Sequence, residues 1–375
     1  MTDQIELAPG VEDRARGGYS LRRRASAYFR TNPLILLERF GLLIALVVLL
    51  VGFSVSSIGP LFTSSDNVEY LLTGGAVVGI IALAMVPPLV AGHFDLSVAA
   101  IAAVSNIATA SAIGIHGLPV AAGIAIGVVA GALIGLANGF LVAKLKLSAF
   151  IVTFGMYILL DGLTTLYTGG AQIVSGIPAS LGAWSGQDFL GVPRPFVALL
   201  VVALVLWFAL SNLPWGRFLE AIGSNEAASR LVGISVDRSV WVAFVVSGAL
   251  AGVAGALLTS VLGGGDPTAA RSYLFPAFAA VFLGSTAIRP GSYNVVGTLL
   301  GVYFVGTAVS GLSLMGVQTW VQSVFNGAAL ILAVAVAAYL ARARRIRDAR
   351  SATRSISPPL RASSPSDPEP KAPRS

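Results

Sequence analysis

Long stretches without a charged residue are the feature that most constrains this chain. The first runs from residue 40 to residue 65 and contains no Asp, Glu, Lys or Arg. A helix needs about 20 consecutive apolar residues to cross a bilayer. Only a helix or a closed barrel satisfies its own backbone hydrogen bonds in lipid. Nine further runs follow, so we predict about ten membrane-spanning helices at residues 40–65, 70–91, 98–114, 120–144, 148–168, 196–213, 239–262, 273–288, 294–312 and 319–340.

The expected fold class is therefore all-α, a polytopic helical bundle in a membrane. Hydrophobic residues make up 55% of the 375-residue chain and charged residues 11%, whereas a soluble domain carries roughly a quarter charged residues. Pro87 and Pro88 are expected to kink or break the second span, because proline removes a helical hydrogen bond and clashes with the preceding turn.

Several classes of active site are excluded by the residues that the chain lacks. It has no cysteine, which excludes disulfides, thiolate catalysis and cysteine-ligated metals. Its two histidines, His93 and His116, lie far apart in the sequence. No catalytic triad, paired-carboxylate site or H-E-x-x-H pattern is present. We therefore expect no catalytic residues, no metal site and no enzymatic activity.

The distribution of charge predicts the topology, because Lys and Arg accumulate in cytoplasmic loops. With ten spans and an internal N-terminus, the basic residues of the loops fall inside: Lys144, Lys146, Arg217, Arg230, Arg238 and Arg289. Asp66, Glu69, segment 169–195 and Asp266 fall outside. We expect a basic cytoplasmic segment at 1–40, a transmembrane domain at 41–341 and a disordered cytoplasmic tail at 342–375. The net charge of +7 then reflects orientation and contact with lipid headgroups, with no nucleic acid as partner.

Glycine recurs at every fourth residue of the fourth span, at Gly123, Gly127, Gly131, Gly135 and Gly139. These residues lie on one face of a helix, where the absence of side chains lets a neighbouring backbone approach closely. The stripe predicts tight helix packing rather than chemistry.

Residues 215–234 lie between two apolar runs, yet they have the features of a short soluble helix. Ser224 is the expected N-cap, because its hydroxyl can accept a bond from a free backbone N–H. Glu226 and Arg230 are four residues apart with the acid first, which is the favourable order. Gly233 fits the left-handed position just past a helix end. What remains is a small apolar face, formed by Ala227, Ala228 and Leu231, which predicts docking against a partner.

This stretch resembles the cytoplasmic coupling loop of permease subunits of ribose-type (monosaccharide) ABC importers, whose pattern is close to G-R-x-x-x-A-I-G-x-N-x-x-A-A-x-x-x-G-I. The matching residues are Gly216, Arg217, Ala221, Ile222, Gly223, Asn225, Ala227, Ala228, Gly233 and Ile234. The resemblance extends over roughly residues 67–341 through D-L-S-V from Asp95, A-N-G-F-L-V from Ala137, A-F-I-V-T-F-G from Ala149, T-G-G from Thr168 and F-L-G-S-T from Phe282. The family's G-x-D-L-S-V-G segment is altered at His93, Phe94 and Ala99, which bears on the identity of the sugar.

The resemblance implies a permease with the fold of ABC importers and a defined set of partners. Such a subunit pairs with a second permease subunit, an identical chain or a close paralogue, in the bacterial cytoplasmic (inner) membrane. It receives sugar from an extracytoplasmic binding protein and binds a cytosolic ATPase. The chain has no G-x-x-x-x-G-K-[ST] loop, so ATP is expected on the partner and no cofactor on this chain.

The candidate coupling loop covers residues 214–238, and Gly223 in it is expected to need a positive φ. The residues assigned to ATPase coupling are Arg217, Gly223, Asn225, Glu226, Ala227, Ala228, Leu231 and Gly233.

Polar residues within or near the spans are candidates for lining the substrate path, because such groups usually face a bundle interior or a cavity. They are Asp95, Asn106, Asn138, Asp161, Gln318, Gln322 and Asn326. Hydrogen bonding between helices is at least as good an interpretation of each one. Asp95 is also a candidate helix cap, and Asp161 is unusual because it lies in the middle of a span.

Two other functions remain open. One is a related ABC permease for branched amino acids or nucleosides, which shares the plan of about ten spans. The other is an ion-coupled secondary transporter with Asp161 as its ion or proton site. The coupling-type loop favours the ATP-driven sugar permease over the second alternative.

Overall fold

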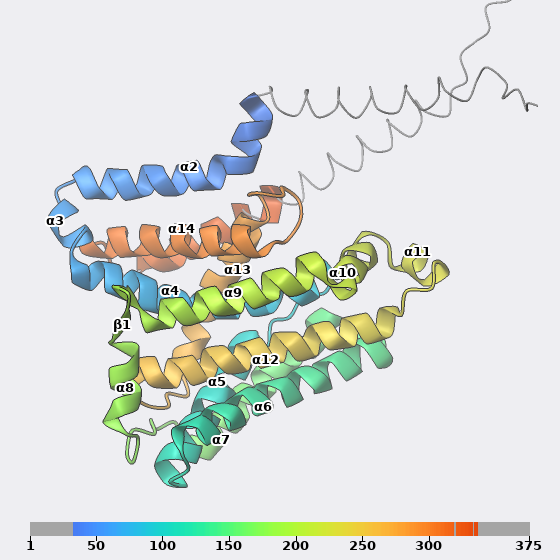
Figure 1. Cartoon of the computed structure of the whole chain (residues 1–375), viewed down its shortest axis with the longest axis horizontal. Coiled ribbons are helices and arrows are strands. Elements are labelled where there is room, and N and C mark those ends of the chain that lie inside the picture. The colour runs from blue at the N-terminus through green and yellow to red at the C-terminus, as the bar shows by residue number, and fades with distance from the viewer. Residues whose placement is uncertain (1–32, 319, 333, 337–375) are drawn as a thin grey trace, which may run out of the picture.

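The computed structural model describes residues 33–318, 320–332 and 334–336. Over this range the chain forms a bundle of long helices whose axes run in nearly the same direction (Figure 1). Helices α10 and α11 lie at one end of the bundle, and α3, α8 and β1 lie at the other (Figure 1). We call these the α11 end and the α8 end. Most of segment 1–40 and the whole tail 342–375 lie outside the described residues.

The first part of the bundle is a helical hairpin. Helix α2 (Pro33–Val55) is followed by the short α3 (Gly59–Phe62) and by α4 (Ser65–Val90). Ser64 caps α4, because its Oγ accepts a hydrogen bond from the N–H of Asn67 at 3.3 Å. Pro87 and Pro88 do not break this helix, contrary to expectation. They lie in its last turn, and the helix continues through them to Val90 although each proline removes one helical hydrogen bond.

The middle of the chain adds four long helices. Helix α5 (Val98–Ala110) continues as the π-turn η1 (Ser111–Ile115), and α6 (Val120–Gly139) continues as the π-turn η2 (Phe140–Lys144). Helix α7 (Ala149–Thr168) follows. The polar segment after it contains α8 (Ala179–Ser185) and a small antiparallel hairpin. The hairpin has two strands of two residues each, β1 (Asp188–Phe189) and β2 (Val192–Pro193). Helix α9 (Arg194–Asn212) then returns to the α11 end.

The remaining elements begin with α10 (Pro214–Ser224) and α11 (Glu226–Leu231), outside the long helices. They continue with α12 (Val236–Leu262), the 3-10 helix η3 (Ala269–Tyr273), α13 (Leu274–Gly284) and α14 (Val295–Leu314). A last apolar helix covers Trp320–Val336.

In the described part of the chain, seven helices are long and apolar enough to cross a membrane. Three further apolar helices, Arg39–Val55, Ala269–Gly284 and Trp320–Val336, are shorter. The expected span at 273–288 is wrong in extent, because α13 has only 11 residues and ends at Gly284. There the chain turns away while Gly284 touches the backbone of Gly297. The all-α polytopic class is confirmed, whereas the number of ten spans is not established.

Helix α12 is central and packs against α4, α5 and α6. The glycine stripe lies at this packing, with all five of its members buried. A Cβ atom at Gly131 would lie 2.4 Å from the carbonyl oxygen of Gly248 on α12. A Cβ atom at Gly135 would lie 2.3 Å from the carbonyl oxygen of Phe244. The predicted role of the stripe in close helix approach is confirmed.

Candidate functional site

The α10–α11 segment is attached to the bundle through α10. Leu219 and Ile222 of α10 are buried in a small apolar cluster with Val236, Val240 and Phe244 of α12. The Nε1 of Trp215 also donates a hydrogen bond to the carbonyl oxygen of Ser239 at 3.2 Å. Because α10 has one apolar face against the bundle, it holds α11 at a fixed place beyond the end of the long helices (Figure 1).

Gly223 is needed for close packing, and the expectation of a positive φ there is wrong. It belongs to the last turn of α10, and it is not among the residues with positive φ. A Cβ atom on Gly223 would lie 2.1 Å from the carbonyl oxygen of Val90, at the end of α4. Glycine therefore lets α10 rest directly on the backbone of α4.

The short helix begins one residue later than expected, with Asn225 rather than Ser224 as its N-cap. The Oδ1 of Asn225 accepts a hydrogen bond from the N–H of Ala228 at 3.0 Å. Ser224 instead completes α10. Two helices thus meet at Asn225, whose extended backbone (φ −157°, ψ 102°) makes the corner. Gly233 has φ +85°, so the prediction of a left-handed residue after the helix is confirmed.

The outer face of α11 is exposed and largely apolar. Ala227 and Ala228 are exposed, and Leu231 and Val232 are 89% and 76% exposed. Only Ser229 of this helix is buried, and its Oγ donates a hydrogen bond to the carbonyl oxygen of Asn225 at 2.9 Å. An isolated surface leucine is unremarkable, but four neighbouring apolar side chains on a protruding helix form a patch suited to binding a protein.

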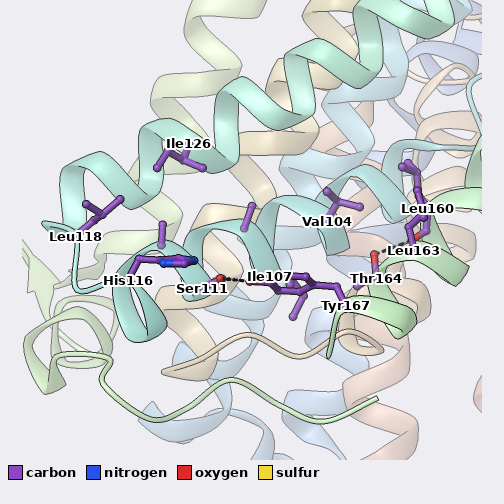
Figure 2. A pocket seen from close by; sticks show the side chains of 12 residues that line it. Val104, Ile107, Ser111, His116, Leu118, Ile126, Leu160, Leu163, Thr164 and Tyr167 are labelled. Atoms are coloured by element: carbon purple, nitrogen blue, oxygen red, sulfur yellow. Dashed lines mark hydrogen bonds between the residues drawn. The ribbon is translucent and has the colours of Figure 1, made fainter. Parts of the chain in front are cut away.

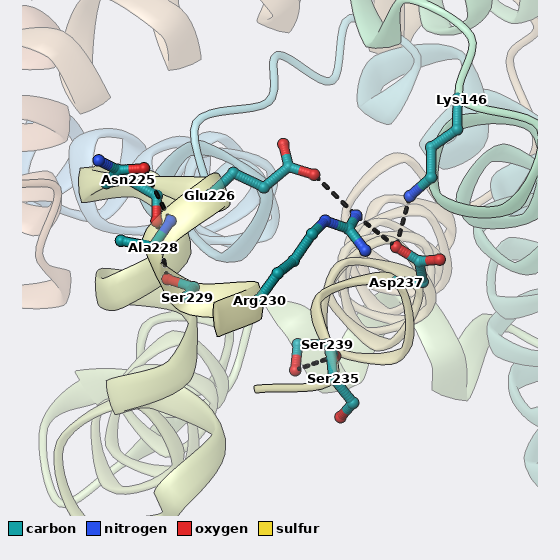
Figure 3. Close-up of polar contacts among 9 residues, drawn as sticks. All are labelled: Lys146, Asn225, Glu226, Ala228, Ser229, Arg230, Ser235, Asp237 and Ser239. Carbon is teal, nitrogen blue, oxygen red and sulfur yellow. Dashed lines mark hydrogen bonds and ion pairs between the residues drawn. The ribbon is translucent and has the colours of Figure 1, made fainter. Parts of the chain in front are cut away.

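Charged residues connect α11 to the neighbouring elements (Figure 3). The predicted pair is confirmed, with Arg230 Nη2 2.8 Å from Glu226 Oε1. The same Nη2 lies 2.7 Å from Asp237 Oδ1 at the start of α12, and Lys146 from the loop after η2 also pairs with Asp237. The hydrogen bonds to Glu226 and Asp237 raise the pKa of Arg230. Exposed pairs of this kind add little stability, but they connect α11 through Asp237 to the start of α12 and to the loop before α7. Arg217 is exposed on α10.

Asp95 and Asn138 lie in a buried polar network between helices. Asp95 Oδ1 accepts hydrogen bonds from the N–H and Oγ of Ser97, at 3.0 and 2.6 Å, and its Oδ2 accepts one from Ser247 Oγ at 2.8 Å. Asn138 Nδ2 donates to Ser97 Oγ at 2.8 Å. Both residues are 0% exposed. The network joins the start of α5 to α6 and α12, so these two residues contribute to helix packing in this structure and face no open path.

Asn106 has a similar position nearer the α8 end. Its Nδ2 donates to Thr259 Oγ1 at 2.9 Å and to the carbonyl oxygen of Gly264 at 3.2 Å, and its Oδ1 accepts from the N–H of Asp266 at 2.8 Å. Asn106 is 0% exposed. The first bond joins α5 to α12, and the other two hold the loop after α12 against α5. Hydrogen bonding between elements therefore accounts for the three buried candidates Asp95, Asn106 and Asn138.

The other four path candidates lie elsewhere. Asp161 of α7 forms an ion pair with Arg271 of η3. Gln318 accepts a hydrogen bond from Trp320 Nε1 at 2.7 Å, and Gln322 donates one to Ser313 Oγ at 2.6 Å. Asn326 is half-buried in the last helix. The seven candidates thus do not meet at one site. Sequence reasoning missed Ser97, Ser247 and Arg271, because each depends on a contact between distant segments.

A cavity of about 410 Å³ lies between α5, η1, α6 and α7 (Figure 2). Its lining is almost wholly apolar, and none of the predicted site residues belongs to it. At one side Ser111 Oγ and Tyr167 OH share a hydrogen bond of 2.5 Å. Each of these hydroxyls already has a partner, so the cavity offers few groups for a polar solute and is not the candidate site.

The family model described as "Branched-chain amino acid transport system / permease component" matches residues 67–334. The chain is 37% identical over 300 residues to the ribose import permease protein RbsC of Haemophilus influenzae, covering 79% of this chain and 92% of that protein. It is 36% identical over 300 residues to RbsC of Bacillus subtilis, covering 80% and 92%. It is also 30% identical over 322 residues to the D-allose transport system permease protein AlsC of Escherichia coli, covering 85% and 98%. No solved structure matches the chain. The chain therefore belongs to the family of permease components of ABC transport systems that this model describes.

Proposed function

We propose that this chain is the membrane permease of an ATP-binding-cassette importer that moves a monosaccharide into the cytoplasm. The observation that carries this proposal is α11, a short capped helix beyond the bundle with an exposed face of Ala227, Ala228 and Leu231. A helix with such a face can bind in a groove of a partner protein. The partner we infer is the ATPase subunit, since the permease itself has no phosphate-binding loop.

The substrate class rests on the relatives. Proteins named for ribose and D-allose transport align with about four-fifths of this chain and with nearly their own full length. The family model is named for branched-chain amino acids, so a permease for these, or for nucleosides, is the alternative. The coupling loop and the D-L-S-V segment resemble the sugar permeases more closely, which favours a monosaccharide.

An ion-coupled carrier is the weaker alternative. In such a carrier an intramembrane carboxylate would bind and release the coupling ion during each cycle. Asp161 instead forms an ion pair with Arg271, so its carboxylate is already engaged by a side chain of the same chain. Membership of a family of ABC permeases also points to ATP as the energy source.

We infer that the α11 end faces the cytoplasm of a bacterial cell and that both termini lie on that side of the inner membrane. Lys146, Arg217, Arg230 and Arg289 support this orientation, because they gather at or near the α11 end. The α8 end would then receive the sugar-binding protein, and a second permease subunit, identical or paralogous, would lie beside this one.

Cysteine labelling tests this orientation, because the chain contains no cysteine. Ser235 at the α11 end and Gln187 at the α8 end are both exposed. We expect a membrane-impermeant maleimide to label Gln187→Cys in spheroplasts and to label Ser235→Cys only after the membrane is opened. The reverse pattern would contradict the orientation.

The function itself is tested by uptake into proteoliposomes that hold the permease with its co-purified ATPase and binding protein. We expect radiolabelled ribose or another monosaccharide to enter only with ATP, and uptake to survive collapse of the proton gradient. A hydrolysis-dead ATPase should abolish it. Leucine and a nucleoside serve as comparison solutes. Uptake that follows the proton gradient without ATP would contradict the proposal, as would transport of leucine in place of every sugar tested.

A further inference from the structure

One flank of α7 carries a row of aromatic and polar side chains. Phe150, Phe154, Tyr157, Asp161 and Thr165 are spaced by four, three, four and four residues, which places them on one side of the helix. We call these five residues the α7 flank. The rings of Phe150 and Phe154 are stacked with centroids 6.2 Å apart, and Thr165 is exposed near the α8 end. The flank is thus aromatic toward the α11 end and polar toward the α8 end.

The Asp161–Arg271 ion pair joins this flank to the segment of η3 and α13. Helix α7 and η3 both pack against α5, so their side chains lie close together on its surface. Arg271 Nη2 also reaches Thr165 Oγ1 at 3.3 Å. One turn after Arg271, Phe275 is 61% exposed. The two segments therefore present charged, hydroxyl and aromatic groups next to each other.

The position of the ion pair excludes lipid as its surroundings. Asp161 lies seven residues before the end of α7 at Thr168, which is about 10 Å along the axis of a helix long enough to span the bilayer. The side chains of Asp161 and Arg271 are 32% and 34% exposed. A charged side chain at such a depth costs at least about 3 kcal/mol if it faces hydrocarbon. The flank must therefore face water or another protein.

Toward the α11 end the same surface is closed by the loop before α5. Thr153 Oγ1, from α7, accepts a hydrogen bond from the N–H of Leu96 at 3.1 Å, while its hydroxyl donates to the carbonyl oxygen of Ala149 at 2.8 Å. The ring of Phe94 stacks on Phe282 of α13 with centroids 6.1 Å apart, and the residue is 42% exposed. The loop that carries Phe94 is thus bonded to α7 through Leu96, and the ring of Phe94 lies on α13, whereas the ion pair joins α7 to η3 nearer the α8 end.

We propose that the α7 flank lines the route of the sugar, with Asp161 and Arg271 as sugar-contacting residues and Phe94 as the aromatic barrier at the cytoplasmic side. This inference rests on the proposed function. A neutral polyhydroxylated ring needs both donors and acceptors for its hydroxyls, and a carboxylate paired with a guanidinium supplies both without a net charge. Exposed aromatic rings such as Phe275 provide apolar surface for the C–H faces of the ring, a combination typical of small-molecule sites.

Water access along the flank is the direct test, made with a sulfonated methanethiosulfonate reagent on the assembled transporter in spheroplasts. Tyr157→Cys and Thr165→Cys leave the ion pair in place. Leu159→Cys and Leu166→Cys are the depth-matched controls, because both residues are exposed and the helical spacing places them on the other side of α7. Thiols react as thiolates, and an apolar environment raises their pKa. We expect Tyr157→Cys and Thr165→Cys to react about tenfold or more faster than the two control variants.

Protection by substrate sharpens the test. Saturating ribose with its binding protein should slow the labelling of Thr165→Cys, and labelling should block uptake. Flank variants that react no faster than Leu159→Cys and Leu166→Cys would overturn the proposal, since the flank would then be closed to water.

The role of the ion pair is tested by kinetics. Loss of a hydrogen bond to a charged group should raise the KM for the sugar about tenfold in Asp161→Asn and in Arg271→Gln, with little change in the ATPase activity of the complex. The double variant, in which no unpaired charge remains, should keep the raised KM. Recovery of the normal KM in the double variant would assign the pair a purely structural role and overturn the sugar contact.

Failure of this inference is distinguishable from failure of the proposed function. If the complex transports a solute other than a sugar while the flank is labelled as expected, the proposed function fails. If sugar uptake depends on ATP but the flank stays unreactive, only the placement of the route fails.

Discussion

Ala228→Arg is expected to abolish sugar uptake while the permease remains in the membrane in nearly normal amount. Ala228 is exposed on α11, and its backbone N–H bonds to Asn225 Oδ1 whatever its side chain. Arginine is also a good helix former, so α11 should persist. On a docked face, however, an unpaired buried charge costs about 3–5 kcal/mol. This corresponds to a loss of roughly 100-fold or more in affinity for the ATPase.

The measurement is the amount of ATPase retained by purified permease, together with ATP-dependent uptake. Ala228→Ser is the matched control, because it changes the same position without adding bulk or charge, and it should keep both. If Ala228→Arg binds the ATPase and transports as the native chain does, α11 is not the docking surface. Size-exclusion chromatography of the variant separates a failure to dock from a failure to fold.

Much of the bundle could be predicted from the sequence, because the membrane imposes simple rules on the backbone. The charge-free runs anticipated α4, α6, α7, α9, α12 and α14 to within a few residues, apart from the start of α4 at Ser65. The spacing of Gly131 and Gly135 anticipated a close helix contact, and the structure identifies α12 as the partner. Periodicity tells which face of a helix is packed, but it does not tell which helix packs there.

The wrong predictions concern residues whose conformation or contacts are decided by another element of the fold. Ser224 and Asn225 are both good caps, and only the corner between α10 and α11 decides in favour of Asn225. Gly223 was expected to need an unusual φ, whereas the constraint on it is the carbonyl group of Val90. The helix expected at 273–288 is shorter in the structure, because α13 begins at Leu274, directly after η3, and ends at Gly284, although the apolar composition of 273–288 matches that of a longer helix.

The residues of the candidate sites also fall into two groups, those that a local motif predicts and those whose role depends on a distant contact. The residues of α11 were found from a local motif, and the Glu226–Arg230 pair follows from spacing alone. The path candidates were chosen for their polarity, which does not distinguish Asp95, whose oxygens are all used inside the core, from Asp161, which reaches a surface. The spacing of Tyr157, Asp161 and Thr165 was a usable signal on α7. Its significance depends on Arg271, which lies far away in the sequence.

Gly131→Leu, in the glycine stripe, is expected to cause a large loss of folded permease. A Cβ atom at Gly131 would lie 2.4 Å from Gly248 O and 2.9 Å from Gly252 Cα, both backbone atoms of α12. Backbone atoms cannot rotate away as a side chain can, so α6 would have to separate from α12. Helix α12 in turn packs against α4 and α5. Overpacking in a core costs about 1–3 kcal/mol even where side chains can adjust, and here they cannot. The free energy lost by overpacking is then a large part of a total free energy of unfolding of about 5–15 kcal/mol.

Gly155→Leu on α7 is the matched control, because a Cβ atom at that position would meet nothing within 4 Å. Leucine is also a better helix former than glycine by somewhat less than about 1 kcal/mol, so the control should be neutral or slightly stabilising. The measurement is the temperature at which half of the detergent-solubilised protein is lost from the monodisperse chromatographic peak. Gly131→Ala should fall between the two leucine variants, since one methyl group already meets Gly248 O but regains some helix propensity. Equal thermal stability of Gly131→Leu and Gly155→Leu would contradict the backbone contact between α6 and α12, on which the position of Asn138 and Ser247 around Asp95 also depends.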